Sequence, residues 1–173
     1  MSDEPASEEI NDLLGSLDHP MAIVTTVVGE ERAGCLVGFH IQCGMEPPRY
    51  AVWLSKANHT YRLATFAEVV AVHFPRSANH ALAALFGEQT GDEIDKFSRC
   101  SWRPGPGGVP LLDDVDDWIV GRRTALVDVD ADHVCIVLAP IASARSGRCD
   151  WLDLSDVLHL EPGHEATERP TPS

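Results

Sequence analysis

The stretch AGCLVGFHIQCGMEPPRYAVWLSKANHTY, residues 33–61, decides the fold that we expect for this chain. Its first half reads as one long strand with glycine at positions 34, 38 and 44. Because side chains alternate between the faces of a strand, the odd positions from Cys35 to Met45 form an entirely apolar face. The glycines lie on the other face, where each costs roughly 0.5 to 1 kcal/mol relative to alanine. Either a flat ligand lies against this bare backbone, or the glycines mark bulges or a barrel corner.

The second half of the stretch predicts a short strand over 50–55, a polar turn and then a helix over 60–67. Backbone N–H groups at the start of a helix, with Lys56 and Arg62 nearby, are typical of a phosphate site. The alternative is that Asn58 only caps the helix, which asparagine does well in any protein. Both interpretations stay open from the residues alone.

Length and composition indicate a single domain with a substantial core. The chain has 173 residues, 44% of them hydrophobic, and a formal net charge of −14. This charge repels phosphate backbones and anionic lipids, so we expect neither nucleic acid nor a membrane as a partner. The acidic start MSDEPASEEINDLL lacks the features of a secretory signal, and no apolar run is long enough to cross a bilayer. We therefore expect a cytoplasmic protein.

Metal and disulfide chemistry have little support in the sequence. The five cysteines include no C-x-x-C pair, so neither a disulfide framework nor a structural zinc site is indicated. Asp130, Asp132 and His133 form a small cluster, but no further ligand at suitable spacing joins them. We expect no metal site. His73, in an apolar strand, is expected to be a hydrogen-bonded core residue.

The rest of the chain predicts more strands than helices. Strands are expected over 21–28, 69–74, 118–129, 133–144 and 149–154, and helices near 10–17, over 77–86 with Gly87 closing it, and over 92–97; a Pro- and Gly-rich loop is expected over 104–110. Short connections and six or seven strands predict a mainly β fold, an antiparallel barrel with two or three short inserted helices. We divide the chain into an acidic, partly disordered segment 1–17, a domain 18–160 and a flexible tail 161–173.

In order and spacing, several motifs resemble those of the flavin reductase-like family, whose fold is an FMN-binding split barrel. The family pattern P-x-x-V-x-T-T is matched by PMAIVTT at 20–26, and N-G-M-T-V-S-S-F followed by D-P-P corresponds to AGCLVGFH at 33–40 and EPP at 46–48. The S-x-T turn corresponds to NHT at 58–60, and the later landmarks to KF at 96–97, WRPG at 102–105 and DADH at 130–133. Gly38 and Phe39 replace two serines, and Asn58 replaces another.

The resemblance implies an NAD(P)H-dependent flavin reductase, an oxidoreductase that passes hydride from NADH or NADPH to FMN, with FAD as the other flavin. It further implies a homodimer, and a flavin-dependent monooxygenase as the protein that receives the reduced flavin. His133 matches the family's histidine near the nicotinamide and is the candidate catalytic residue; its alternative is a turn histidine that faces solvent. The implied flavin-binding residues are Leu36, Val37, Gly38, Phe39, His40, Ser55, Lys56, Asn58, His59, Thr60, Lys96 and Phe97.

Two other functions are compatible with the same predicted binding site. A flavoprotein that retains its FMN and reduces no free flavin is the main alternative. A split-barrel relative that oxidises pyridoxamine phosphate, or that binds haem, is the third. The barrel strands offer no obvious haem ligand, so haem is the weakest of these.

Overall fold

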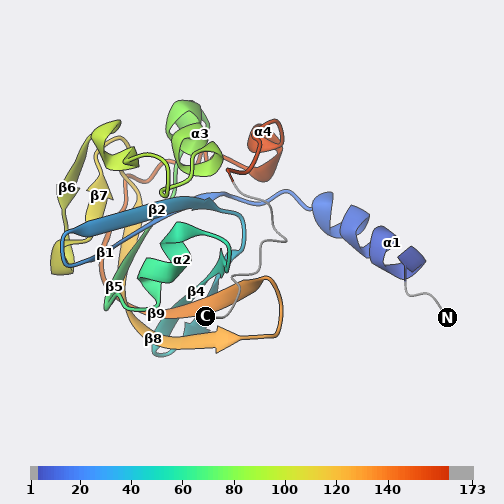
Figure 1. The fold of residues 1–173 in the computed structure, drawn as a ribbon, viewed down its shortest axis with the longest axis horizontal. Helices are drawn as coiled ribbons and strands as arrows, with labels where there is room; N and C mark the ends of the chain where they lie inside the picture. The colour runs from blue at the N-terminus through green and yellow to red at the C-terminus, as the bar shows by residue number, and fades with distance from the viewer. Residues whose placement is uncertain (1–3, 164–173) are drawn as a thin grey trace.

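The computed structural model describes residues 4–163 and contains a seven-stranded antiparallel sheet curled into a barrel (Figure 1). The strand order is β2-β1-β5-β8-β9-β4-β3, so β2 and β3 are the two edges at which the barrel is split. This arrangement confirms the expected split barrel. The strands are β1 (Ala22–Val28), β2 (Glu31–Val37), β3 (His40–Met45), β4 (Pro48–Ser55), β5 (Val69–His73), β8 (Trp118–Asp128) and β9 (His133–Ala144).

Two hairpins expected from the sequence are present. Strands β1 and β2 pair from Ala22↔Val37 to Val28↔Glu31, and Gly29 in the turn has a positive φ of 60° that suits glycine. Strands β8 and β9 pair over most of their length and are joined by a short turn in which Asp130 has φ 58°. The β-branched runs of these strands therefore fold as their composition indicates.

The glycine-rich stretch is two strands rather than the one that we expected. Strand β2 ends at Val37 and β3 begins at His40, and the two strands lie at opposite edges of the sheet. The apolar face divides accordingly: Val37 is buried in the barrel, whereas Ile41 and Met45 are 59% and 85% exposed. The alternating pattern continues across the break, so it does not reveal that the chain changes sides there.

Protein atoms cover the glycines of this stretch. A Cβ on Gly34 would lie 2.7 Å from the Phe86 ring, so Phe86 occupies the space that we had considered for a flat ligand. Gly44 lies at the irregularity between Gln42 and Gly44 in the pairing of β3 with β4. The bulge interpretation is correct for Gly44, and the bare-backbone interpretation is wrong for Gly34.

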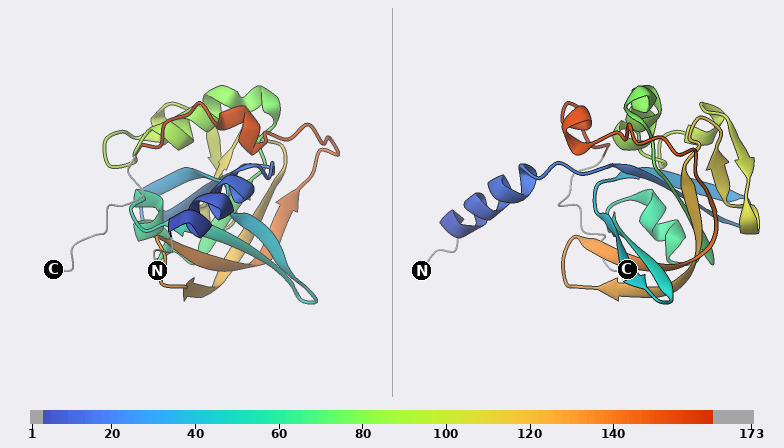
Figure 2. Two further views of the ribbon diagram at one scale, coloured as in Figure 1. Left: turned by 90° about the vertical axis from the view of Figure 1, so that its right-hand side faces the viewer. Right: turned by 180° about the vertical axis from the view of Figure 1, so that it is seen from behind.

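Helices cover the barrel on the side of β1 and β2, and one helix stands apart from it (Figures 1 and 2). The α-helices are α1 (Glu4–Gly15), α2 (His59–Ala64), α3 (His80–Glu88) and α4 (Leu154–Val157), with 3-10 turns η1 (Ser77–Asn79), η2 (Lys96–Ser98) and η3 (Pro106–Gly108). Helix α1 begins earlier than the expected helix near residue 10, and Gly87 lies inside α3 rather than closing it. In the segment 1–17 that we expected to be partly disordered, residues 4–15 form α1 and residues 1–3 lie outside the described residues, as does most of the expected flexible tail 161–173. None of the described helices is long and apolar enough to cross a membrane.

Two segments differ from their expected structure. The loop expected over 104–110 is present and has positive φ at Gly107 and Gly108, but it joins two short strands that were not expected, β6 (Trp102–Pro104) and β7 (Pro110–Leu112). The strand expected over 149–154 is absent. Only the single bridges Arg76↔Trp151 and Pro20↔Asp153 form there.

Arg76 tethers this C-terminal segment. The side chain is 7% exposed and donates hydrogen bonds to Asp117 at 2.7 Å and to Asp150 at 2.6 Å. Asp117 in turn accepts hydrogen bonds from the backbone N–H and hydroxyl of Ser146. Because a buried charge is stable only when it is paired, these ion pairs hold the segment after β9 against the barrel without strand pairing.

His73 confirms the expectation of a core histidine. It is fully buried, its Nε2 accepts a hydrogen bond from the Leu112 backbone N–H at 3.2 Å, and its Nδ1 lies 3.0 Å from the Ile23 carbonyl oxygen. The ring is therefore neutral, with the proton on Nδ1. Burial lowers the pKa of His73 to about 4.

This pKa predicts a pH dependence of stability. Between the ordinary histidine pKa of about 6.5 and the folded value, the unfolded chain binds a proton that the folded chain does not. Stability from His73 is thus complete above about pH 6.5 and lost as the pH falls toward 4, by about 2 kcal/mol between pH 7 and pH 5. Urea unfolding at several pH values measures this loss, and the non-titrating variant His73→Gln should lack it. Equal losses in the two proteins would contradict the assignment.

Candidate functional site

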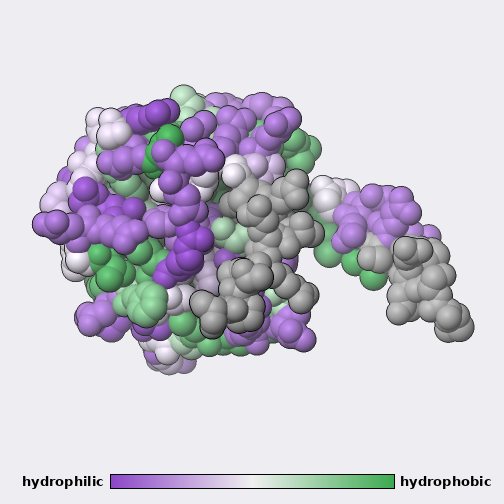
Figure 3. All heavy atoms as spheres, in the orientation of Figure 1, coloured by the Kyte–Doolittle hydropathy of each residue, from purple (hydrophilic) through white to green (hydrophobic). Residues whose placement is uncertain are grey.

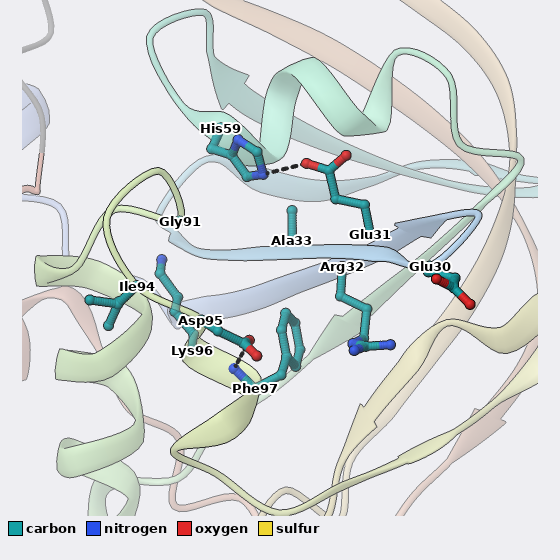
Figure 4. Close-up of a pocket in the computed structure, with 10 residues that line it drawn as sticks. All are labelled: Glu30, Glu31, Arg32, Ala33, His59, Gly91, Ile94, Asp95, Lys96 and Phe97. Carbon is teal, nitrogen blue, oxygen red and sulfur yellow. Dashed lines mark hydrogen bonds and ion pairs between the residues drawn. The ribbon is translucent and has the colours of Figure 1, made fainter.

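A cavity of about 270 Å³ lies at the outer edge of β2, between the start of α2 and the segment that leads into η2 (Figure 4). It brings together three regions that are far apart in the sequence. The lining residues are Glu30, Glu31, Arg32, Ala33, His59, Gly91, Ile94, Asp95, Lys96 and Phe97. Three of the expected flavin-binding residues, His59, Lys96 and Phe97, are among them.

Lys96 is the buried cation of this cavity. It is only 4% exposed, and its Nζ donates hydrogen bonds to the Gly34 carbonyl oxygen at 2.9 Å and to the Phe86 carbonyl oxygen at 3.1 Å. Burial lowers the pKa of Lys96. An ammonium group has three N–H donors, and within the described residues no carboxylate pairs with this one. Besides its two carbonyl bonds, Nζ lies 5.5 Å from the centroid of the Phe86 ring, so its charge is held by carbonyl oxygens and an aromatic face at the wall of the cavity.

The start of α2 lies close to the same place. The Asn58 side chain accepts a hydrogen bond from the Thr60 backbone N–H at 3.0 Å, which confirms the helix-cap interpretation. Burial raises the pKa of Cys35 on β2, opposed by the charge of Lys96 and by hydrogen bonds from Thr60 and Asn58. The Thr60 side chain is 1% exposed and faces this thiol, so the fold brings Asn58, Thr60 and Lys96 together around β2.

The other cations of the turn are already paired. Lys56 Nζ lies 2.9 Å from a carboxylate oxygen of Asp128, and Arg62 pairs with Asp92. The His59 ring lies between two acids, with Nε2 3.2 Å from Glu31 and Nδ1 3.1 Å from Asp92. These pairs neutralise the charges that we had considered for a phosphate, so Lys96 is better placed for that role than Lys56.

Loop 91–95 approaches α2 closely at Gly91. A Cβ on Gly91 would lie 3.0 Å from the His59 ring, so a larger residue would push the loop away. Asp95 begins η2 by accepting a hydrogen bond from the Phe97 backbone N–H at 3.0 Å. The loop thus closes one wall of the cavity and presents Lys96 and Phe97 to it (Figure 4).

His133 and Phe39 form a second group outside the cavity lining. Their ring centroids are 5.2 Å apart, and His133 Nδ1 lies 2.9 Å from Asp132. His133 pairs with Ser55 between β9 and β4, and the Lys56 backbone N–H donates to the Asp132 carbonyl oxygen at 2.8 Å. The fold therefore places the candidate catalytic histidine beside the 55–58 turn, next to an aromatic ring that is 58% exposed.

The remaining expected residues use their side chains for packing. Val37 lies in the barrel core, and Leu36 packs on the opposite face of β2. Gly38 is near His19 and Met21, while His40 hydrogen bonds to Tyr50 and to the Pro20 carbonyl oxygen, both at 2.7 Å.

The residues fit a flavin nucleotide in three respects. Strand β2 is an edge strand, and the Gly34 carbonyl points away from β1 to Lys96, so alternate backbone groups of β2 face outward without a strand partner. Phe97 supplies an apolar wall, and Lys96 supplies a cation. The volume is near the lower end for ligand pockets, about 300 Å³, so the cavity would hold one part of the nucleotide.

Sequence reasoning missed seven residues of the cavity: Glu30, Glu31, Arg32, Ala33, Gly91, Ile94 and Asp95. Three of them directly precede the stretch 33–61 from which the flavin site was expected, Ala33 begins that stretch, and three lie in the irregular segment before KF. The pairing of Glu31 and Asp92 with His59 brings these segments together, although they are distant in sequence. A single sequence does not reveal such a contact.

Comparisons with known proteins agree with this fold. The high molecular weight rubredoxin of Moorella thermoacetica is 29% identical over 103 residues, which are 58% of this chain and 44% of that protein. The chain thus spans less than half of this curated relative. The structure of an NADH:FAD oxidoreductase from Streptomyces globisporus is 18% identical with a TM-score of 0.80, covering 100% of this chain and 98% of that one. A flavin reductase complexed with NADP+ is 23% identical with a TM-score of 0.74, covering 86% and 98%.

The match that assigns the chain is to a domain family. Residues 14–146 match the flavin reductase like domain, and this range contains every strand of the sheet and the whole cavity lining. The chain belongs to the flavin reductase-like family.

Proposed function

We propose that this protein is an NAD(P)H-dependent flavin reductase that acts on FMN or FAD. The observation that carries the proposal is the cavity at the edge of β2, whose wall contains the buried ammonium of Lys96 and the Phe97 ring. A flavin has a planar ring and a phosphate, which correspond to this aromatic wall and to this cation. Family membership and the neighbours named for NADH:FAD and NADP+ chemistry support the same activity.

The bound flavin would supply the hydride chemistry, and the protein would supply orientation and exclusion of water. Lys96 would hold the phosphate, while outward backbone groups of β2 would hold the ring against the barrel edge. His133, oriented by Asp132 and beside the exposed Phe39, would position the nicotinamide ring. Hydride transfer requires the reacting atoms to come within about 3 to 3.5 Å of each other.

The activity is tested by NADH and NADPH oxidation at 340 nm with FMN, FAD or no flavin added. We expect oxidation well above the protein-free rate that continues through many equivalents of free flavin. His133→Ala should lower kcat/KM for the nicotinamide about tenfold while leaving flavin affinity unchanged, as expected for loss of a group that orients one substrate. His80→Ala, on the surface of α3, is the matched control.

Two results would contradict the proposal. A protein that neither binds FMN nor accelerates NADH oxidation in its presence would exclude a flavin reductase. A protein that keeps a bound flavin but reduces no added flavin would be a flavoprotein of the retaining kind instead.

We also propose that the protein is cytoplasmic and that it forms a homodimer. The dimer is supported by apolar surface that the described chain leaves uncovered. Helix α1 extends from the barrel with one hydrophobic side, seen in Figure 3, and carries Ile10, Leu13 and Leu14, each more than half exposed. Edge strand β3 exposes Ile41 and Met45. Apolar surface of this extent is typical of an interface, and a short isolated helix is marginal in water. Light scattering should give twice the chain mass; a monomer would contradict the dimer.

A monooxygenase that takes up the reduced flavin is a further part of the proposal. It is supported by the family alone.

A further inference from the structure

Phe39 and His133 form a pair of rings that we call the aromatic corner. Their centroids are 5.2 Å apart and their planes meet at 63°, so the edge of one ring faces the other. The Phe39 side chain is 58% exposed, whereas the side chain of His133 is 25% exposed. The corner therefore presents a flat apolar face to solvent with an imidazole beside it.

Backbone contacts to strand β4 hold both residues of the corner. The Phe39 carbonyl oxygen accepts a hydrogen bond from the Trp53 backbone N–H at 2.9 Å. His133, at the start of β9, is in register with Ser55 at the end of β4. Because both residues are tied to one strand, the corner is formed before any ligand arrives, which lowers the entropic cost of binding.

Asp132 determines which nitrogen of His133 is available. The Nδ1 atom lies 2.9 Å from a carboxylate oxygen of Asp132, and a carboxylate accepts hydrogen bonds, so Nδ1 carries the proton. Among residues 4–163, no hydrogen bond or ion pair engages Nε2. In the neutral ring this atom is an acceptor. The corner thus combines an apolar face with one unused polar atom.

The chemistry of the corner suits an uncharged planar ring better than a phosphate. The nearest lysine in sequence to Ser55 is Lys56, and its ammonium pairs with Asp128 at 2.9 Å. A flat ring can stack on Phe39, and an N–H group at the edge of that ring can donate to Nε2. Nicotinamide has both features, because its carboxamide lies at the edge of a single six-membered ring.

The corner also lies where a second substrate is needed. Strand β2, along which we place the flavin, ends at Val37, two residues before Phe39. Phe39 and His133 are absent from the lining of the cavity beside Lys96, so the two sites do not share residues. A ring bound at the corner would therefore approach the flavin from the end of β2 without competing for the cavity.

We propose that the nicotinamide ring of NADH or NADPH stacks on Phe39, with its carboxamide at His133 Nε2. Phe39 is then a binding residue for the second substrate, an inference that rests on the proposed function. The family pattern has serine where this chain has Phe39, so the stacking face is a feature of this sequence.

The test measures two affinities by calorimetry in FMN-saturated protein. NAD+ carries the nicotinamide and does not react with oxidised FMN, and ADP-ribose lacks the nicotinamide; NADP+ and its phosphorylated ADP-ribose replace them if NADPH is the better substrate. Phe39→Leu keeps apolar bulk but removes the flat face. Loss of aromatic stacking predicts about tenfold weaker NAD+ binding and less than about twofold weaker ADP-ribose binding.

Two further variants serve as controls. Phe39→Tyr keeps the aromatic face and should bind NAD+ within about twofold of the wild type. Phe66→Leu changes another exposed phenylalanine, after the end of α2, and should leave both affinities unchanged. Thermal unfolding checks that the variants fold, and quenching of flavin fluorescence should show the same FMN affinity in all of them.

Three outcomes would overturn the inference. Unchanged NAD+ affinity in Phe39→Leu would show that the nicotinamide does not stack there. Equal weakening of NAD+ and ADP-ribose would show that Phe39 acts on another part of the nucleotide. Weaker FMN binding, or a halved mass in light scattering, with unchanged NAD+ affinity would assign the face to the flavin or to a second copy of the chain.

The proposed function can be judged separately. Each of these outcomes leaves it intact if the wild type oxidises NADH or NADPH with added flavin. A wild type that binds neither FMN nor a nicotinamide nucleotide would refute the inference and the proposed function together.

Discussion

The ammonium group of Lys96 joins the edge of the barrel to the helical layer. It binds the carbonyl oxygens of Gly34 on β2 and Phe86 on α3, and its own segment closes the cavity. An unpaired buried cation is costly, and its two carbonyl bonds offset only part of its lost hydration. The same residue thus fixes the distance between sheet and helix and leaves a site that an anion would complete. Glycine suits position 34 because a Cβ there would collide with the Phe86 ring.

Near the cavity, several acidic side chains of this strongly acidic chain are paired with basic side chains. Glu31 and Asp92 meet His59, Asp92 also meets Arg62, and Asp128 meets Lys56. These contacts tie β2, α2 and the loop after α3 into one unit. The lysine and arginine side chains that line the cavity are Lys96 and Arg32, because Lys56 and Arg62 lie outside its lining.

The sequence predicted the elements whose signal is local. The β-branched run before Gly29 and the paired runs around Asp130 fold as the expected hairpins, and His73 is a core histidine as its apolar strand indicated. The sequence did not predict the features that depend on contacts between residues distant in the chain. The alternation through Cys35 to Met45 hid the crossing between sheet edges at Gly38, and the C-terminal segment is held by Arg76 rather than by strand pairing.

The candidate site shows the same division. Resemblance to the family pointed to Lys96, Phe97 and His59, which the fold brings to one cavity. Arg32 and Asp95 carried no motif, because their roles depend on Trp102 and on the closure of η2. The cap at Asn58 was one of the two alternatives that the sequence left open, whereas the burial of Thr60 became visible only with the packing of α2 against Cys35. Propensity and spacing therefore locate the strands, whereas the cavity is a product of tertiary contacts.

The central claim is that a flavin binds at the outer edge of β2, beside Lys96. A crystal structure of the protein with FMN measures this most directly. We expect the flavin along β2 with its phosphate in the cavity and a phosphate oxygen about 3 Å from Lys96 Nζ. A flavin bound elsewhere on the barrel, with Lys96 still bonded only to Gly34 and Phe86, would contradict the account.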